Sequence, residues 1–254
     1  MTNVLICIKR VPEISGEILL SDDQYSIDAR HVGYTLSAHD ECAIELGVGL
    51  AKDTGGHARV LSIGAAGAAE QLRYAVAVGA DSATLIEADP EAFGPADVAA
   101  AIASEVRQAQ MSFELILVGN DAADTGDFQV GVRLAYQLDR PVLTGINTAE
   151  IRDATVLARG AGPQGVDVFE IPLPALIAVQ EGGVEPRYPS IRGRMKAKRL
   201  KIEQKAAPLE PAGSGRVRLT LPEPKPSTVH MLGEGPDAAP ALVDVLARSG
   251  VLNR

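Results

Sequence analysis

The sequence predicts an α/β fold with a doubly wound, mostly parallel sheet, a small antiparallel appendage and an extended C-terminal arm. Three observations support this fold class. Short apolar runs alternate with stretches of helical apolar spacing up to about residue 147, strand-like runs then follow one another without helices, and a Pro-rich tail ends the chain. Strands that alternate with helices of about 10–15 residues are typical of parallel sheets with right-handed crossovers.

The alternating region defines the main sheet and its helices. Apolar runs bounded by polar residues predict buried strands at residues 4–8, 58–63, 82–86, 115–118 and 142–146, and weak alternation predicts a small edge strand at 25–28. Helical spacing covers residues 40–52, 68–78, 96–110 and 128–138. Asp40 is the expected N-cap of the first helix, and Gly79 is expected to end the second.

The pattern changes after residue 147. Strand-like pieces without intervening helices predict an antiparallel appendage built from residues 149–152, 155–158, 166–171 and 175–179. The tail is then interrupted by prolines from Pro208 to Pro240, and one last helix is predicted near 241–249. We therefore expect an α/β domain at 1–205 and a Pro-rich C-terminal arm at 206–254 that packs on a partner's surface.

The composition is that of a globular protein. Hydrophobic residues make up 46% of the 254 residues, and the mean hydropathy is +0.08. The net charge of −9 argues against general nucleic-acid binding, because a phosphate polymer needs a basic surface. The opening MTNVLICIKRV is unlike a secretory signal, and no apolar stretch reaches the roughly 18 residues of a membrane helix. We expect a soluble, cytoplasmic protein in which Cys7 and Cys42 are buried free thiols.

Three loops follow predicted strands and are the expected ligand-binding loops, namely residues 9–13, 64–67 and 119–131. Neither G-x-G-x-x-G nor G-x-x-x-x-G-K-[ST] occurs in them. The third loop, GNDAADTGDFQVG, leads into a helix whose first backbone amides can hold a phosphate, and its glycines permit close approach. The equally plausible alternative is that Asp124 and Asp127 only cap a surface helix.

A second distinctive segment, EGGVEPRYPSIRGRMKAKRLKIE, spans residues 181–203 and is strongly basic from Arg187 to Lys201. Glycines at 182–183 and prolines at 186 and 189 predict a constrained loop at 181–194, and rigid exposed loops often serve recognition. The alternative interpretation is a solvated helix face followed by a polar linker.

These motifs resemble those of the electron transfer flavoprotein β subunit, and the likeness covers nearly the whole chain. Residues 185–188 and 195–198 are similar to the family's E-P-R-Y…M-K-A-K signature, and residues 4–11 resemble its opening V-x-V-K-R-V strand. Residues 40–45 resemble its C-E-I-A-V-E helix start. Residues 124–131 resemble the acidic D-x-x-x-x-Q-x-G segment that wraps a buried AMP in this family.

The resemblance implies an adenine-nucleotide α-hydrolase-like fold and a heterodimer with an α subunit that carries the redox-active FAD. The β subunit would hold a structural AMP. Electrons would come from flavin dehydrogenases, such as the acyl-CoA dehydrogenases of fatty acid oxidation, and leave to a quinone oxidoreductase. Such a subunit is an electron carrier and not an enzyme. No metal site is expected, and no catalytic role is expected for His31, His39, His57 or Glu185.

The resemblance also implies positions for the bound groups. Adenine is expected against the backbone of Cys7 and near Ser37 and Ile63, and His39 falls where the family places an aromatic residue close to the α-subunit flavin. Ile14 replaces a Tyr of some members, so flavin stacking from that position is lost. The phosphate site is expected to be formed by the amides of Phe128, Gln129 and Val130, with Gly119, Ala122 and Asp124 lining the pocket.

Partner docking is assigned by the same resemblance to Gly183, Val184, Glu185, Arg187, Tyr188 and Ile191. Residues 182–184 occupy the region where some members present an anchoring Leu, so the identity of the docking partner stays open.

Two alternatives are retained. The first is a bifurcating flavoprotein β subunit with a second FAD in place of AMP. Those relatives usually read D-G-D-T-A-Q-V-G, and here Asp127 adds an anion and Phe128 adds bulk, which favours AMP. The second is a homodimeric nucleotide-binding stress-type module, which would have no reason to carry the segment at 185–198 or the Pro-rich tail.

Overall fold

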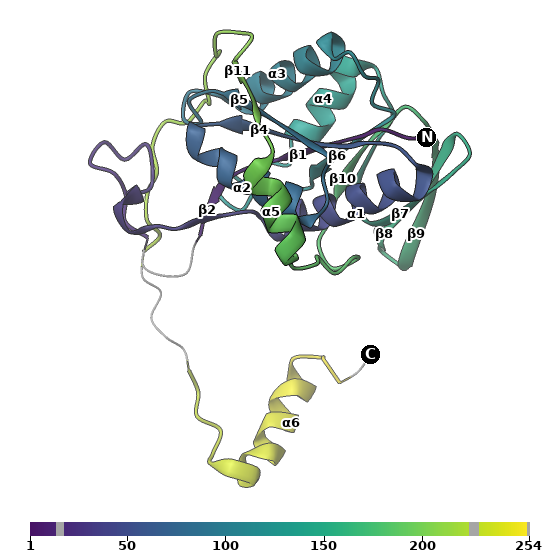
Figure 1. The fold of residues 1–254 in the computed structure, drawn as a ribbon. Coiled ribbons are helices and arrows are strands. Elements are labelled where there is room, and N and C mark those ends of the chain that lie inside the picture. Colours follow the sequence, from purple (N-terminus) through teal and green to yellow (C-terminus); the bar gives the residue numbers. More distant parts are fainter. Residues whose placement is uncertain (14–17, 224–228, 253–254) are drawn as a thin grey trace. The chain divides into compact units, whose positions relative to one another are not determined.

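The first of two compact units contains the main sheet. The computed structural model describes residues 1–13, 18–223 and 229–252, so Ile14 lies outside the described residues (Figure 1). The chain divides into units of Met1–Leu219 and Thr220–Arg254. Among the helices of the described part, none is long and apolar enough to cross a membrane.

The main sheet has nine strands in the order β11-β5-β4-β1-β6-β10-β7-β8-β9. Pairing is parallel from β11 to β7 and antiparallel from β7 to β9, which confirms the doubly wound, mostly parallel architecture. The strands are β1 (Val4–Ile8), β4 (Ala58–Gly64), β5 (Ser82–Glu87), β6 (Leu115–Gly119), β7 (Val142–Arg152), β8 (Thr155–Gly162), β9 (Gly165–Pro172), β10 (Ala175–Val179) and β11 (Glu203–Ala206).

Helices cover both faces of this sheet (Figure 1). Those of the first unit are α1 (Ala38–Thr54), α2 (Ala69–Val78), α3 (Pro95–Gln108), α4 (Val130–Leu138) and α5 (Ile191–Arg199), with short 3-10 turns η1 (Ala29–His31) and η2 (Ala66–Ala68). A small second sheet pairs β2 (Val11–Pro12) with β3 (Tyr34–Thr35). The second unit contains η3 (Gly235–Ala238) and α6 (Ala239–Arg248).

Strand β1 shows how the core is divided between the two faces. All five of its residues are buried, and alternate side chains point to opposite sides of the sheet. Ile6 packs in the cluster that includes α1 and α2, whereas Leu5 packs in the cluster that includes α3 and α4. Each fully buried aliphatic side chain contributes about 1.5–3 kcal/mol to the hydrophobic stabilisation. The central strands therefore anchor helices on both faces.

The sequence placed one strand wrongly. Residues 175–179 were expected in the antiparallel appendage, but β10 is a parallel strand between β6 and β7. All its residues are buried, as a continuous apolar run in the middle of a parallel sheet should be. The two strands expected at 142–146 and 149–152 are one strand, β7, whose pairing with β8 shifts register after Ile146. Residues 25–28 form only an isolated bridge, between Ile27 and Leu20, and not an edge strand.

Two helix starts also differ from expectation. Ser37, and not Asp40, is the N-cap of α1, because the Ser37 hydroxyl accepts the N–H of Asp40 at 3.2 Å. Helix α4 begins at Val130, two residues after the expected start. Phe128 has a φ of +52°, in the left-handed region, and cannot belong to a right-handed helix. Gly79 ends α2 as expected.

The segment after β11 packs on the first unit. The Asp97 carboxylate at the start of α3 accepts the N–H groups of Ala212 at 3.0 Å and Gly213 at 3.3 Å. Gly94, the N-cap of α3, is also close, because a Cβ at this position would lie 2.6 Å from the Gly213 carbonyl oxygen. The compact first unit thus continues beyond residue 205 to Leu219.

Removal of the residues after Leu219 is expected to leave the first unit folded, whereas removal after Lys205 should destabilise it. The longer deletion removes Ala206 of β11 and the N–H groups of Ala212 and Gly213 that donate to Asp97. We expect the free energy of unfolding to fall by about 1–2 kcal/mol. Urea denaturation of the two truncated proteins measures the difference. Equal free energies would show that residues 206–219 contribute nothing to the stability of the first unit.

Candidate functional site

The residues that the resemblance assigns to a nucleotide lie at one edge of the sheet. Cys7, Ile63 and Gly119 stand at or near the carboxyl ends of β1, β4 and β6, which are adjacent strands. The chain passes from β1 to β4 and β5 on one side and continues with β6 on the other side of β1. Ligands of open α/β sheets bind where the strand order reverses in this way, here between β1 and β6.

Asp40 joins the two strands at this reversal point. Pairing between β1 and β6 ends at Cys7 and Val118. Beyond it, the Asp40 Oδ2 accepts the N–H of Lys9 at 2.9 Å, and the same carboxylate accepts the N–H of Gly119. Gly119 has to be a glycine, because a Cβ there would overlap the Asp40 Oδ1.

Burial dominates the electrostatics of this carboxyl. Asp40 is only 5% exposed, and desolvation raises its pKa to about 7 although the N–H donors and the Lys9 ammonium favour the charged form. Burial also raises the pKa of the neighbouring Cys7 thiol, and the charge of Asp40 adds to that effect. Cys7 and Cys42 are buried free thiols, as expected. Cys7 is therefore an inert buried thiol and not a nucleophile.

The loop between β6 and α4 is shaped by turns and one ion pair. The Ala122 carbonyl accepts the N–H of Gly126 at 2.9 Å, and Gly126 has a φ of +59°. The Lys9 ammonium lies 2.7 Å from the Asp124 Oδ1, so the loop after β1 is tied to the loop after β6. Asp124 is thus paired with Lys9, which differs from the capping role considered for it.

The residues expected to bind a phosphate lie at the start of α4. Helix α4 has no side-chain cap, and the Asp127 Oδ1 accepts the N–H of Gln129 with a long distance of 3.4 Å. The Gln129 Oε1 accepts from the Arg133 guanidinium at 2.8 and 3.0 Å. The amide NH₂ of Gln129 is therefore the group that can donate to a ligand. Within the described part of the chain, the Asp121 Oδ1 is buried without a hydrogen-bond partner. The donor set suits an oxyanion, and the bond from Gln129 to Asp127 is weak enough to be exchanged.

Helix α1 connects this edge with the segment expected to dock a partner. Ser37 is buried at its N-cap, whereas the His39 Nδ1 accepts the N–H of Glu181 at 3.1 Å. His39 is therefore joined to the loop at 181–190 and not to the loop at 119–131. A shallow pocket of about 690 Å³ lies beside it, lined by Ala38, Glu41, Cys42 and residues 181–186.

The expected docking residues divide into an inward and an outward set. Arg187 donates to both carboxylate oxygens of Glu45 on α1, with Nε at 2.7 Å from Oε2, and holds the pKa of that carboxyl below its usual value. Val184 packs against the core, and a Cβ at Gly183 would overlap the Asn147 carbonyl. By contrast, Tyr188 is 93% exposed and Ile191 is 81% exposed. Glu185 and Arg187 are exposed as well, so Arg187 can meet a partner while it holds Glu45.

The loop at 181–194 is shorter than expected, because α5 begins at Ile191 with Ser190 as its N-cap. Helix α5 is fixed on α2, since a Cβ at Gly193 would overlap the Ala77 carbonyl and the Lys196 Nζ donates to the Ala80 carbonyl at 3.1 Å. The segment is thus a rigid loop followed by a rigid helix.

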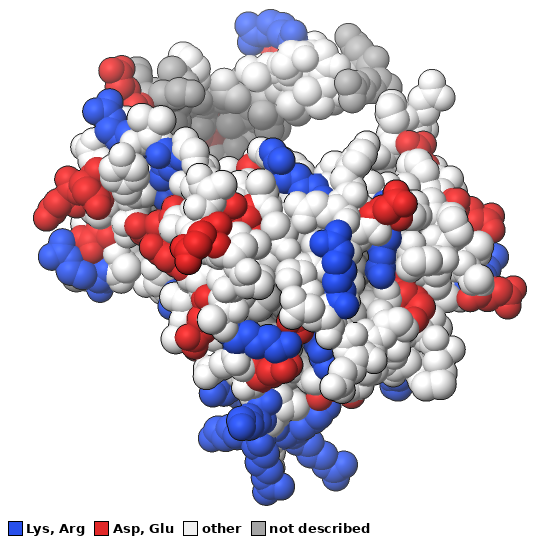
Figure 2. All heavy atoms as spheres, turned by 90° about the horizontal axis from the view of Figure 1, so that it is seen from above, with Lys and Arg blue, Asp and Glu red and all other residues white. Residues whose placement is uncertain are grey.

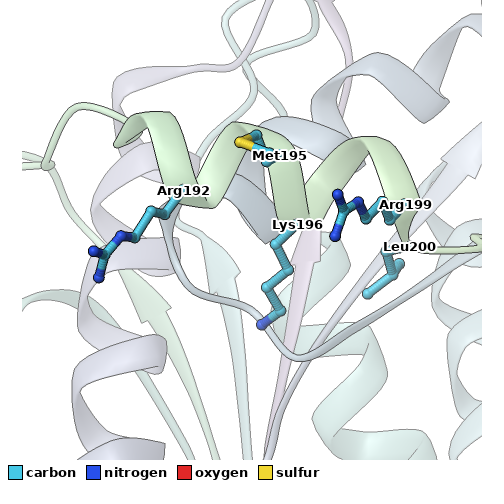
Figure 3. A pocket seen from close by; sticks show the side chains of 5 residues that line it. All are labelled: Arg192, Met195, Lys196, Arg199 and Leu200. Atoms are coloured by element: carbon cyan, nitrogen blue, oxygen red, sulfur yellow. The ribbon is translucent and has the colours of Figure 1, made fainter.

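The outer surface of α5 is basic around a shallow apolar hollow. Figure 3 shows Arg192, Lys196 and Arg199 projecting from the helix beside Met195 and Leu200, and together they line a pocket of about 540 Å³. In Figure 2 basic side chains crowd the lower edge of the face shown, and carboxylates are spread among basic groups elsewhere. Such a surface on a protein of net charge −9 fits an acidic partner.

Sequence reasoning found the loops of this site but missed the residues that fix them. Asp40 was read as a cap, and Lys9 was named only as the start of a loop. The one sequence signal near Asp40's partners is the glycine at 119, which ends a buried apolar run; only the structure shows that a Cβ there would overlap Asp40. Within the described residues, no group of three or more His, Cys, Asp or Glu side chains is placed to hold a metal ion.

Comparison with known proteins gives a consistent result. Residues 26–210 match the family model described as the electron transfer flavoprotein domain. The chain is 32% identical over 202 residues to the electron transfer flavoprotein subunit beta of Bacillus subtilis, covering 80% of this chain and 78% of that protein. It is 31% identical to the subunit of that name in Syntrophomonas wolfei, covering 91% and 90%. It is also 30% identical to the caffeyl-CoA reductase-Etf complex subunit CarD of Acetobacterium woodii, covering 76% and 74%.

Asp40 is expected to make folding stability depend on pH. Its pKa of about 7 in the folded chain lies above the ordinary value of 3.8, so the folded state retains a proton that the unfolded state loses. This residue's contribution to stability is complete below about pH 4 and is lost as the pH rises to about 7. Urea denaturation of wild type and Asp40→Asn over this range measures it, with Asp53→Asn on the same helix as control. If wild type and Asp40→Asn show the same pH dependence, Asp40 does not titrate in this way.

Proposed function

The chain belongs to the electron transfer flavoprotein β-subunit family, and from this premise we propose that it binds AMP at the β1–β6 edge and pairs with an α subunit that carries FAD. Its role in electron transfer follows from the family. The observation that supports the nucleotide most directly is the loop at 119–131, which brings backbone donors at the start of α4 to the reversal point of the sheet.

The phosphate is assigned to the amides of Phe128, Gln129 and Val130. The left-handed Phe128 turns the chain into α4, so the first N–H groups of the helix lie at its open end. The helix dipole adds a partial positive charge there. A phosphate would replace the Asp127 carboxylate on the Gln129 N–H, and the Lys9 ammonium offsets the nearby charge of Asp124.

The adenine is assigned to the ends of β1 and β4, near Cys7, Ile63 and Ser37. Cys7 and Ser37 are buried, so their surroundings are already ordered. Ala122 and Gly119 complete the lining on the β6 side. AMP is favoured over FAD because Asp127 places a further carboxylate in the loop, which opposes a second phosphate group. The side chain of Phe128 is 57% exposed and adds bulk to the same loop.

FAD is proposed to be held mainly by the α subunit, with this chain closing one side of its site. When bound, the flavin supplies the redox chemistry, and this chain's residues position and shield it. His39 and the shallow pocket beside it lie on the surface assigned to that contact. His39 accepts the Glu181 N–H and so fixes the loop at 181–190 relative to α1. This role does not depend on a contact between His39 and the flavin.

The predicted arm at 206–254 is proposed to attach the α subunit. Its residues from Thr220 onward form the second unit, in which α6 exposes Leu242 and Val243. An amphipathic helix of ten residues is not stable by itself in water, and a partner surface would bury these side chains.

The electron donor is proposed to be a flavin dehydrogenase, such as an acyl-CoA dehydrogenase, and the acceptor a quinone oxidoreductase. The relative from Acetobacterium woodii is named as part of a complex with a CoA-linked reductase, which supports a partner of this chemical class. Docking is assigned to the loop at 181–190 and the first turn of α5. Arg187 and Val184 fix its shape from within, and Tyr188 and Ile191 present an apolar contact among basic side chains.

The purified assembly is expected to contain one AMP and one FAD for each pair of chains. Acid extraction followed by chromatography identifies and counts the nucleotides. Recovery of two FAD and no AMP would instead favour the bifurcating type of subunit. An assembly without any adenine nucleotide in this chain would contradict the proposal.

Replacement of Tyr188 by Ala together with Ile191 by Asp is expected to slow flavin reduction by the dehydrogenase at least about tenfold, because both exposed side chains would contact the partner. Folding and FAD content should not change, since neither side chain supports the core. Stopped-flow measurement of flavin reduction tests this prediction.

The matched control for this pair is Tyr136→Ala, which removes another largely exposed tyrosine, from α4. Val184→Asp is not suitable, because Val184 packs on the core. Unchanged reduction by the double variant would remove this surface from the docking proposal, and lost FAD would show that it faces the α subunit instead.

A further inference from the structure

We infer that Asp40 is the positioning residue of the nucleotide site, because its carboxylate sets the separation of β1 and β6 and so places both loops that hold the nucleotide. This inference rests on the proposed nucleotide-binding function. It goes beyond that function by assigning to a buried side chain, which need not touch the nucleotide, control over how tightly the nucleotide is held.

The first step of the argument is the end of the strand pairing. In a parallel ladder the pairs Cys7–Val118 and Leu5–Ile116 would be followed by further backbone bonds between β1 and β6. Instead the N–H groups of Lys9 and Gly119 both donate to Asp40. A side chain from α1 therefore takes over the connection where the pairing of the two strands ends.

The second step is the tight fit of this connection. Asp40 is buried, its own N–H is held by Ser37, and its carboxylate lies where a side chain at residue 119 would be. The carboxylate is thus held from the strand side by Lys9 and Gly119, and the backbone of Asp40 is held at the helix start by Ser37. Buried polar groups that are fully hydrogen-bonded hold a single arrangement, because any displacement leaves a donor without a partner.

The third step is the path from Asp40 to the loops. Lys9 carries the hydrogen bond to Asp40 on its backbone and the ion pair to Asp124 on its side chain, at 2.9 and 2.7 Å. Gly119 is the first residue of the loop at 119–131. A shift of Asp40 would therefore move the loop at 119–131 at two points, its start at Gly119 and Asp124. The backbone N–H groups at the beginning of α4 would then be displaced as well.

The ionisable groups on the elements around Asp40 within the described residues can be named by element. From β1 and its following loop these are the Cys7 thiol and the Lys9 ammonium, and the loop after β6 adds Asp124, which is paired with Lys9. On α1 the next carboxyl is Glu41, whose pKa is also raised by burial. Lys9 is the one among these that favours the ionised carboxylate of Asp40. The ionised form accepts both N–H groups, so it is the form that positions the loops.

The test compares wild type with Asp40→Asn. This variant keeps the side-chain shape, but its NH₂ group faces a backbone N–H that needs an acceptor. Asp53→Asn, on the same helix, is the control. Amide hydrogen exchange at Lys9 and Gly119, measured without nucleotide, should be faster in Asp40→Asn only. Isothermal titration with AMP at about pH 8 should give an affinity about tenfold or more below wild type. The advantage of wild type over Asp40→Asn should shrink as the pH falls to about 6, since wild-type Asp40 then takes up a proton.

Each outcome decides between the inference and the function beneath it. If wild type binds AMP and Asp40→Asn binds it equally well, the inference is wrong and the proposed function stands. If wild type does not bind AMP, the proposed function fails and the inference fails with it. Should Asp40→Asn not fold, the pH dependence of exchange at Lys9 and Gly119 in wild type decides. Protection that does not change between about pH 8 and 6 overturns the inference.

Discussion

The hydrogen bonds from Lys9 and Gly119 to the Asp40 carboxylate are the interaction on which the organisation of this protein depends. They join two central strands and one helix at the point where the strand order reverses. A carboxylate buried here costs desolvation free energy, which appears as a pKa raised to about 7. Retaining such a group fits a requirement for precise loop placement, because an apolar side chain would leave two backbone donors without partners.

Helix α1 connects the nucleotide edge with the docking surface. Its first turn carries Ser37 and Asp40 toward the strand ends, and Glu45, further along the helix, holds Arg187 of the docking segment. His39 adds a hydrogen bond to the backbone of Glu181. One helix, α1, therefore fixes both the edge assigned to the nucleotide and the segment assigned to partner docking. The two surfaces are held in a constant position relative to each other.

Much of this architecture could be predicted from the sequence, for physical reasons that particular elements show. Continuous apolar runs such as residues 4–8 and 115–118 are typical of strands buried on both faces, and they form β1 and β6. The same pattern at 175–179 was assigned to the antiparallel strands instead of the parallel part of the sheet, because no helix precedes it and strand order depends on contacts distant in sequence. The start of α4 was placed too early because apolar spacing does not report the left-handed φ of Phe128.

The candidate site was predictable to the level of its loops and not of its interactions. The glycines and acidic residues at 119–131 identify a loop after a strand, which general rules place at the ligand edge. That Asp124 pairs with Lys9, or that Arg187 pairs with Glu45 while Tyr188 faces solvent, depends on which elements meet in space. A crystal structure of the purified assembly with its bound nucleotide tests the central claim most directly. We expect a phosphate that accepts from the amides of Phe128, Gln129 and Val130 while Asp40 still holds Lys9 and Gly119. A nucleotide bound at another edge of the sheet would contradict it.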